Sequence, residues 1–277
     1  MDIVFADRSE RGMLRLTGPQ NAWFLHQILT QAFEDIGDGE ARDAAMITAH
    51  GRLVGYLEVV ASAGALWAHF DEGLRDTLPD ELRRYVFATQ VEIEDVGDRY
   101  GLVLLVVEDP LAAVEGLPVA CVHPTRSLGV PAAYLWVERS DMERVLDALR
   151  AKGGRPADER ELESLRIHNG MPRWGKEMDT KTFPQEVGID DWAVHYDKGC
   201  YVGQEAMAKI HFRGKVNRRL ARILGSGLRE GADVLFEGAK VGVVTSATDD
   251  SGLALVKATI EAGVAVDIEG EEAKVAS

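Results

Sequence analysis

The segment 198–205, KGCYVGQE, carries the residues of this chain best suited to chemistry. Gly199 and Gly203 flank Cys200 and allow backbone conformations that a Cβ forbids, and a helix-forming stretch, GQEAMAKIHF, follows. The pattern predicts a compact loop that leads into a helix. Lys198 and the following helix N-terminus lower the pKa of the Cys200 thiol and favour the reactive thiolate. Glu205 in the first turn of the helix raises this pKa. The alternative is a buried cysteine in a tight turn.

A group of cations follows this segment. Between residues 206 and 222 there is no acidic residue, and the cations are Lys209, Arg213, Lys215, Arg218, Arg219 and Arg222. In a chain of net charge −15, this concentration indicates an anion site for the carboxylate or phosphate of a ligand, or for a stretch of RNA. The alternative is a solvated face of a helix and turn.

Other candidate residues give weaker signals. No two histidines lie three or four positions apart, and His195 with Cys200 is too little for a zinc site, so we predict no metal site. Trp174 and Trp192 lie in an irregular segment, where a flat ligand could stack on them; the alternative is that they belong to the core. The chain has no GxSxG, P-loop or HExxH motif.

The composition is that of an acidic globular protein. The chain has 277 residues, 31 Lys and Arg against 46 Asp and Glu, and 46% hydrophobic residues. This length suggests about two domains, and the negative charge disfavours a general nucleic-acid binder unless a local basic patch overrides it. Two cysteines without a CxxC pairing favour a reducing compartment. Because no leader pattern and no apolar run near the ~20 residues of a membrane span occurs, we expect a cytoplasmic protein without membrane contact.

The elements that must position these residues alternate between strands and helices. A strand at 12–16 precedes a helix that begins after Pro19, and apolar runs broken by glycine predict strands at 44–48, 53–60 and 65–70. A helix at 72–85 is followed by strands at 90–96 and 102–107, a short helix after Pro110 and a strand at 132–137. This order is typical of split βαβ, ferredoxin-like units.

The second half of the chain changes character. Ser140 and Glu143 predict a capping box for a helix that ends near Lys152, and 157–168 predicts another helix. Residues 169–197 show little periodicity, and an irregular stretch of that length is more often functional than idle. Short β-like runs at 220–224, 240–245, 253–257 and 264–268 predict a small C-terminal barrel or sandwich.

The segment KGCYVGQE resembles the signature of the YgfZ family of folate-binding proteins, which is related to the glycine-cleavage T protein (aminomethyltransferase) and to mitochondrial iron–sulfur assembly factors. The likeness extends along nearly the whole chain. The stretches that carry it are LRLTGPQNAWFLHQILT, HGRLVGYLEV, LRIHNGMPRWGKEM, FPQEVG, FRGKVNRRL, VGVVTSA and LALVK.

The resemblance implies an α+β fold with the three-lobed architecture of the T protein around a central channel. We expect a first α/β lobe built from residues 1–45 with 155–215 and a ferredoxin-like second lobe at 46–154. The third lobe is a small β-barrel at 216–277.

The resemblance also implies function. The expected ligand is tetrahydrofolate or a derivative, whose flat pterin suits aromatic stacking and whose anionic tail suits Lys and Arg. The family role is to maintain iron–sulfur enzymes, one of which modifies tRNA, so iron–sulfur proteins or assembly factors are the expected partners. Cys200 is the expected catalytic residue. The expected folate-binding residues are Lys198, Gly199, Tyr201, Gly203, Gln204, Glu205, Arg166, Trp174, Arg213 and Arg219.

Two departures separate the chain from the aminomethyltransferase branch. That branch carries Arg-x-Glu-x-Gly, whose carboxylate accepts paired N–H bonds from the pterin, but His168 stands in the glutamate position here. The branch also has an aspartate after its Gly-Gly-Ile-Leu strand opening, where this chain continues to Gly55 and Tyr56. The carboxylate that methylene transfer needs is therefore missing at that place.

Three functions remain open from the sequence. The first is a folate-binding accessory protein that supports iron–sulfur cluster assembly or repair, with Cys200 and the cations around one shared cavity. The second is a tetrahydrofolate-dependent aminomethyltransferase. The third is a tRNA-binding module, whose affinity would fall steeply with salt.

Overall fold

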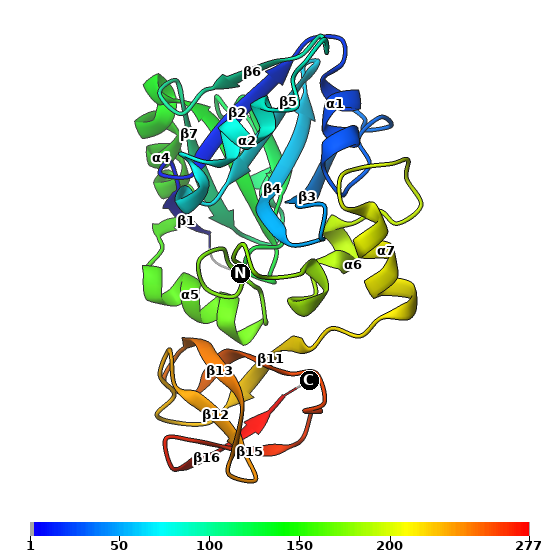
Figure 1. Cartoon of the computed structure of the whole chain (residues 1–277). Coiled ribbons are helices and arrows are strands. Elements are labelled where there is room, and N and C mark those ends of the chain that lie inside the picture. The colour runs from blue at the N-terminus through cyan, green and yellow to red at the C-terminus, as the bar shows by residue number, and fades with distance from the viewer. Residues whose placement is uncertain (1–2, 277) are drawn as a thin grey trace.

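The computed structural model describes residues 3–276, which form two open β-sheets and a closed β-barrel (Figure 1). The first sheet has the order β3-β4-β5-β2-β6. Its strands are β2 (Gly12–Thr17), β3 (Ala41–Ile47), β4 (Leu53–Ser62), β5 (Ala65–Phe70) and β6 (Glu92–Asp95). The second sheet has the order β10-β1-β7-β9-β8. Its strands are β1 (Val4–Asp7), β7 (Tyr100–Val106), β8 (Cys121–Pro124), β9 (Ala132–Glu138) and β10 (Arg155–Pro156).

The two sheets pack face to face. Side chains alternate between the faces of a strand, so β5 turns Trp67 toward the second sheet, where Trp136 of β9 meets it with 5.3 Å between ring centroids. Met13 and Leu102 belong to the same buried cluster. This inter-sheet core fixes the relative position of strands that are far apart in the sequence.

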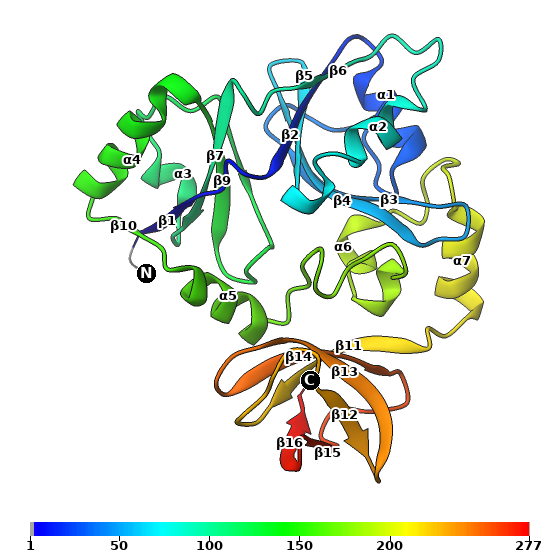
Figure 2. The ribbon, with the colours of Figure 1, turned by 60° about the vertical axis from the view of Figure 1, so that its left-hand side comes forward.

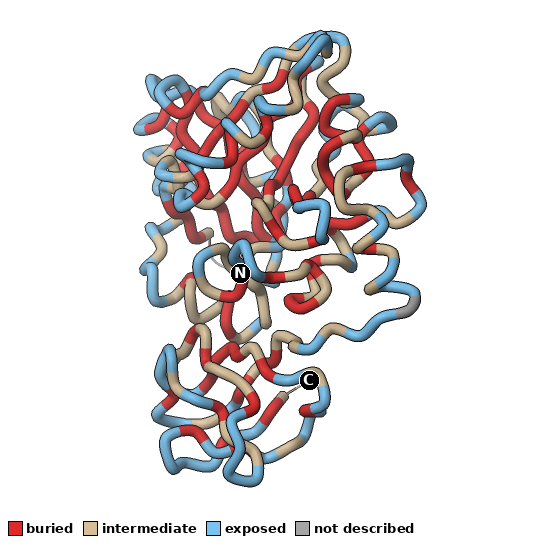
Figure 3. Tube along the Cα trace, viewed as in Figure 1, coloured by how far each residue is buried: buried red, intermediate tan, exposed pale blue. Residues whose placement is uncertain are grey.

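Helices cover the outer faces of both sheets (Figure 2). Helix α1 (Asn21–Ile28) and helix α2 (Leu78–Arg83) pack on the first sheet, where Phe24 and Leu78 share a core with Leu57. On the second sheet, α4 (Met142–Ala151) packs Val145 and Leu149 against the outward side chains of β7 and β9. The central strands β4, β5, β7 and β9 are accordingly buried, and many of the connections are exposed (Figure 3).

The remaining helices are short or lie near the barrel. They are α3 (Pro110–Ala113), α5 (Glu159–His168), α6 (Asp190–Ala193) and α7 (Gln204–Arg213), with 3-10 turns at Glu72–Leu74, Arg139–Asp141 and Pro184–Glu186. The barrel closes in the order β11-β14-β13-β12-β15-β16. Its strands are β11 (Arg218–Leu224), β12 (Asp233–Phe236), β13 (Ala239–Ala247), β14 (Ser251–Lys257), β15 (Ala265–Ile268) and β16 (Glu271–Val275).

The α+β class and the C-terminal barrel predicted from the sequence are confirmed, but several details are corrected. The expected lobe boundary after residue 45 falls inside β3, where Ala45 pairs with Tyr56 of β4. The strands between residues 12 and 95 all belong to one sheet. Helix α4 begins after Asp141 and has no side-chain cap, so the predicted Ser140 capping box is wrong. The single helix expected at 72–85 is a 3-10 turn followed by α2.

No helix within residues 3–276 is long and apolar enough to cross a membrane.

Candidate functional site

The loop 194–203 connects α6 to α7 and presents Cys200 at the surface. Cys200 is a free, exposed cysteine, so the alternative of a cysteine buried in a tight turn is wrong. The predicted compact loop leading into a helix is confirmed, because α7 begins at Gln204. The Gln204 side-chain amide donates to the backbone carbonyl of Lys198 at 3.2 Å and closes the loop on itself.

Lys198 is turned away from solvent and anchors this loop to the end of α1. Its Nζ donates to the backbone carbonyl oxygens of His26, Leu29 and Gln31, the last at 2.8 Å. Burial lowers the pKa of Lys198 to about 7, and three carbonyl acceptors favour the charged ammonium. Because its donors are occupied by the backbone, Lys198 has a structural role here and is not free to hold a ligand.

The two glycines of the loop differ in what they require. Gly203 has φ +82°, and a Cβ there would lie 2.4 Å from the Thr48 carbonyl oxygen. Gly199 is outside the left-handed region, and its nearest neighbour would be His26 Nε2 at 3.8 Å. Only Gly203 therefore needs to be glycine, because the 47–51 turn packs directly on the start of α7.

Tyr201 and Glu205 do not face a common pocket. The Tyr201 ring is buried in a core with Ile47 and Met207, and this burial raises the pKa of Tyr201 to about 12. Glu205 is exposed and pairs with Lys209 one turn later, at 2.7 Å. These residues stabilise the loop and the helix.

The predicted cation group does not form one anion site. Arg218 is held by the carboxylate of Glu186 through two hydrogen bonds of 3.0 and 2.8 Å. Arg219 donates to the backbone carbonyl of Ile260, and Arg222 donates to that of His168. The side chain of Arg213 lies outside the described part of the chain. Lys209, Arg218, Arg219 and Arg222 are thus each bound to a different partner within the fold.

A cavity of about 1060 Å³ lies where the two sheets, α5 and the barrel meet. Its aromatic lining is Tyr56, Tyr134, Trp174 and Trp192, and its cations are Arg8, Arg11, Arg126, Arg160, Arg166, Arg173 and Lys176. Of the residues predicted from the sequence, Arg166 and Trp174 line this cavity, whereas Cys200 and the rest of the KGCYVGQE segment do not. The expectation of one cavity shared by the thiol and the cations is therefore wrong, because the loop packs against α1 and β3 instead.

Arg166 of α5 is a structural arginine. Its Nε and one terminal nitrogen bond the two oxygens of Glu163 at 2.9 and 2.6 Å. Its other bonds reach Met171 O at 2.7 Å, Glu177 Oε2 at 2.8 Å and Ser246 Oγ of the barrel at 2.6 Å. A guanidinium has five N–H donors, and all five are used. The predicted folate contact by Arg166 is therefore not supported.

His168, which stands where the aminomethyltransferase branch carries glutamate, has partners of its own. His168 Nδ1 lies 2.7 Å from the Ser164 carbonyl oxygen, and Nε2 faces Asp250 at 3.2 Å. His168 is not among the residues that line the cavity. His168 therefore does not replace the pterin contact that the glutamate makes in that branch.

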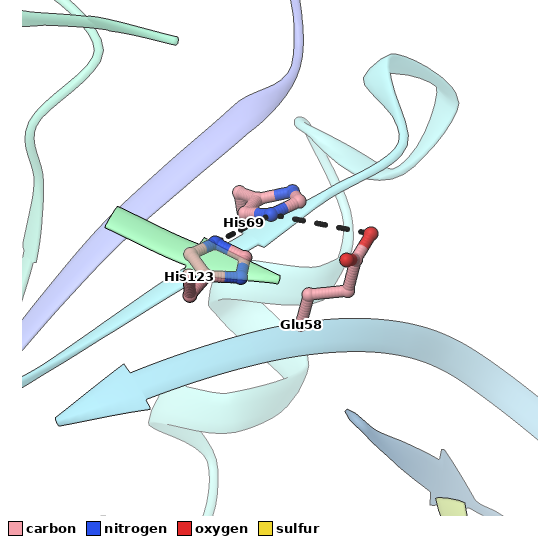
Figure 4. Close-up of side chains that lie close together, drawn as sticks. All are labelled: Glu58, His69 and His123. Atoms are coloured by element: carbon pink, nitrogen blue, oxygen red, sulfur yellow. Dashed lines mark hydrogen bonds and ion pairs between the residues drawn. The ribbon is translucent and has the colours of Figure 1, made fainter. Parts of the chain in front are cut away.

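The structure contains a buried polar cluster at the cavity wall that was not predicted from the sequence. Figure 4 shows His69 of β5 between Glu58 of β4 and His123 of β8. The Nε2 atoms of the two histidines are 3.2 Å apart, and His69 Nε2 is 4.0 Å from Glu58 Oε1. Burial is the main reason that the pKa of Glu58 rises to about 8 and that of His123 falls to about 4. The one available signal was Glu58 itself, a charged residue within the apolar run LVGYLEVV.

The hydrogen bonds assign the protons of this cluster. Arg11 Nε–H donates to His69 Nδ1 at 3.0 Å, so the His69 proton is on Nε2 and is directed to His123 Nε2. His123 accepts this proton at Nε2, so its own ring proton is on Nδ1 and is directed to the Pro124 carbonyl oxygen at 3.1 Å. Both histidines are thereby neutral, in agreement with the downward pKa shifts that burial produces in each.

Glu58, His69 and His123 have ligand atoms within 4.8 Å of one another, a spacing compatible with a metal ion. A metal-bound histidine normally donates its second N–H to an acceptor, but Nδ1 of His69 accepts from the Arg11 guanidinium instead. The guanidinium also lies 3.8 Å from Glu58 and supplies the positive charge. The arrangement therefore favours a hydrogen-bonded cluster over a cation site.

Comparisons with known proteins show what the chain is similar to. It is 28% identical to an aminomethyltransferase of Thermotoga petrophila over 298 residues, covering 95% of this chain and 80% of that protein. It is 26% identical to the tRNA-modifying protein YgfZ of Klebsiella pneumoniae, covering 77% and 69%. A chloroplastic protein of Arabidopsis thaliana, whose name assigns it to the transferases, is 24% identical; the chain spans 62% of its length. No protein-family model matches the chain.

The fold comparison is stronger than the sequence comparisons. The crystal structure of the glycine cleavage system aminomethyltransferase T from Bartonella henselae matches the whole chain with a TM-score of 0.88, at 17% identity and 85% coverage of that protein. The chain therefore has the T-protein fold, and its resemblance to YgfZ and to the aminomethyltransferases is confirmed.

Proposed function

We propose that this protein binds a reduced folate in its central cavity and acts as a YgfZ-like accessory protein in tRNA modification, through support of iron–sulfur enzymes. The observation that carries the proposal is the cavity itself, which has walls from both sheets, α5 and the barrel. Its volume of about 1060 Å³ slightly exceeds the range of typical small-molecule sites, roughly 300–1,000 Å³, and so leaves room for a ligand of folate size. The similarity to the YgfZ protein of Klebsiella pneumoniae supports the accessory role.

The lining suits the two ends of a folate. Trp174 and Tyr134 offer flat faces to a pterin, and Arg126, Arg160 and Arg173 are cations for the glutamate carboxylates. Arg126 and Arg173 are candidates for the tail, because their side chains are 66% and 42% exposed and their ion pairs span 4.0 and 3.3 Å.

Calorimetry with 5-formyltetrahydrofolate tests the proposal. We expect one binding site, and weaker binding in Trp174→Ala, with Trp23→Ala as the control because Trp23 is exposed and does not line the cavity. A titration with tRNA at two salt concentrations tests the RNA-binding alternative. Binding of tRNA alone, with a steep loss of affinity at higher salt, would replace the folate proposal.

An aminomethyltransferase is the second candidate, and the 28% identity to the Thermotoga petrophila enzyme favours it. The chain differs where that chemistry needs a carboxylate, since Gly55 and Tyr56 occupy the place. The Tyr56 hydroxyl is engaged by Trp192 Nε1 at 3.1 Å. We expect no methylene transfer to tetrahydrofolate from an aminomethyl-loaded lipoyl carrier. Turnover comparable to that of a T protein would establish the second candidate.

The exposed thiol of Cys200 enters the proposal as a group that acts outside the cavity, on a partner rather than on the bound folate. Its accessibility supports this role, and it is not among the residues that line the cavity. In cells that lack the protein, Cys200→Ser should fail to restore iron–sulfur enzyme activity, whereas Cys121→Ser should restore it. Full rescue by Cys200→Ser would leave the cysteine without a functional role.

A further inference from the structure

The carboxyl group of Glu58 is the unusual feature of the cavity wall. Glu58 is 3% exposed, yet it lines the cavity. Its Oε2 atom is buried and has no hydrogen-bond partner among the described residues. A buried polar atom without a partner is costly, so a side chain that keeps one beside a cavity is suited to a ligand.

The cation and the imidazole nearest to Glu58 lie too far from its carboxyl oxygens to form hydrogen bonds with them. Arg11 Nη2 lies 3.8 Å from Oε1, and His69 Nε2 lies 4.0 Å from it with its proton directed to His123. Asp43 is the cross-strand neighbour on β3, and Thr125 is a further neighbour that favours the ionised carboxyl. Arg11 and Thr125 thus stabilise a carboxylate, while Asp43 opposes it.

Four other carboxylates at the cavity are already paired with cations. Glu159 is bound by Arg8, Glu163 by Arg166, and Glu230 by Lys176, each at 2.6–2.9 Å. Glu161 is bound by Arg155 at 2.6 and 2.8 Å. These carboxylates lack the vacant acceptor that Glu58 has, so they are poorer partners for an N–H group of a ligand.

We propose that Glu58 recognises a ligand edge with two neighbouring N–H donors, and that a folate in this cavity directs the 2-amino-4-oxo edge of its pterin to Glu58. The two oxygens of a carboxylate match two parallel N–H groups, as they match a guanidinium. This inference rests on the proposed folate function. It assigns pterin recognition to β4 rather than to α5, where His168 stands.

Binding of this edge to a carboxylate changes the proton balance. Free Glu58 is mostly protonated at pH 7, because burial and Asp43 raise its pKa to about 8. Two N–H donors require the ionised form, so the carboxyl releases its proton to solvent when the ligand binds. The ligand keeps both of its own protons.

Calorimetry in two buffers of different ionisation enthalpy at pH 7 tests the inference with 5-formyltetrahydrofolate. The wild-type protein should release protons on binding. Glu58→Gln should bind roughly 10–100-fold more weakly, without proton release, because a hydrogen bond to a charged group contributes about 1.5–3 kcal/mol. The matched control is Glu230→Gln, whose carboxylate lines the same cavity but pairs with Lys176; it should keep wild-type affinity and proton release.

A change in the ligand tests the same contact without altering the protein. A folate analogue with a methyl group in place of the 2-amino group should bind the wild-type protein at least 10-fold more weakly. If Glu58→Gln and this analogue both leave affinity and proton release unchanged, the inference is wrong while the folate function stands.

The fragment 2-amino-6-methylpyrimidin-4-one separates the remaining outcomes. If the wild-type protein binds this fragment in a Glu58-dependent manner but does not bind the folate, the inference stands and the proposed function fails. If it binds neither compound at millimolar concentration, both are overturned.

Discussion

Arg166 and Glu177 form a buried ion pair, with 2.8 Å between Nη1 and Oε2, at the junction of α5, the 169–182 segment and the barrel. Ser246 of β13 completes the junction, because its hydroxyl donates to Glu177 Oε1 at 2.6 Å and accepts from Arg166 at 2.6 Å. Thr245 donates to the same carboxylate oxygen at 2.8 Å. Through Ser246 and Thr245, this buried ion pair is one of the links between the barrel and the rest of the fold.

Replacement of Arg166 by Met should destabilise the protein by about 3–5 kcal/mol, because it leaves the Glu177 carboxylate buried without its cation. The measurement is the free energy of unfolding from urea denaturation. The control is Arg173→Met, whose half-exposed pair with Glu163 contributes less than about 1 kcal/mol. Equal effects of the two substitutions would show that the junction is not held by this pair.

Gly203→Ala should cost at least about 2 kcal/mol, through left-handed strain together with the close approach to the Thr48 carbonyl. Gly199→Ala in the same loop should change the free energy of unfolding by less than about 0.5 kcal/mol, because the new Cβ meets no atom closer than 3.8 Å. Thermal denaturation of both variants provides the comparison. A loss of stability in Gly199→Ala as large as that in Gly203→Ala would contradict the structure of the loop.

The two cysteines should differ in reactivity. Cys200 is exposed, whereas burial raises the pKa of the Cys121 thiol to about 12. Titration of the native protein with Ellman's reagent should modify one thiol rapidly, and titration in guanidinium chloride should modify two. Cys200→Ser should abolish the rapid phase. Rapid modification of Cys200→Ser would show that Cys121 is accessible in the native protein.

Glu58 should make the wild-type protein less stable as the pH rises. Burial raises its pKa to about 8 in the folded protein, against 4.5 as the ordinary value, so the folded state keeps a proton that the unfolded state loses between these values. The stabilisation is complete below pH 4.5 and is lost as the pH passes through 8. At about 1.4 kcal/mol for each pKa unit, the loss is on the order of 3–5 kcal/mol.

Urea denaturation of wild-type protein and Glu58→Gln from pH 5 to pH 9 measures this effect. The free energy of unfolding of the wild-type protein should fall with pH relative to that of the variant. His123 acts in the opposite sense, because its pKa falls to about 4 and its contribution is lost as the pH drops from 6.5. A stability difference between the two proteins that does not change with pH would show that Glu58 is ionised in the folded state.

Much of the fold could be predicted from local sequence patterns. The apolar runs that became β4, β5, β7 and β9 were recognised because each is long and bounded by turn residues. Strands β1 and β8 were missed, since each has only four residues and is identified by its pairing with β7 or β9. The lobe boundary was misplaced because sheet membership depends on pairing between distant strands, which periodicity does not encode.

The candidate site could be predicted less well. The KGCYVGQE segment was identified as a special loop, but its lysine bonds to carbonyls around the end of α1, about 170 positions away in the chain. Arg166 is a buried arginine whose N–H donors all bind groups within the protein. Sequence spacing does not predict such a hydrogen-bond network. The cluster of Glu58, His69 and His123 joins three strands of two sheets, so its members show no helical or CxxC spacing.

Strand β6 lies at the edge of the first sheet, where it pairs with β2 and presents its other side to solvent. Three of its four residues are acidic: Glu92, Glu94 and Asp95. A free edge is a template on which a second chain can add a strand, and like charges along it repel a copy of itself. The barrel needs no such protection, because a closed ring of strands has no edge. The acidic β6 therefore disfavours edge-to-edge aggregation at this edge of the first sheet.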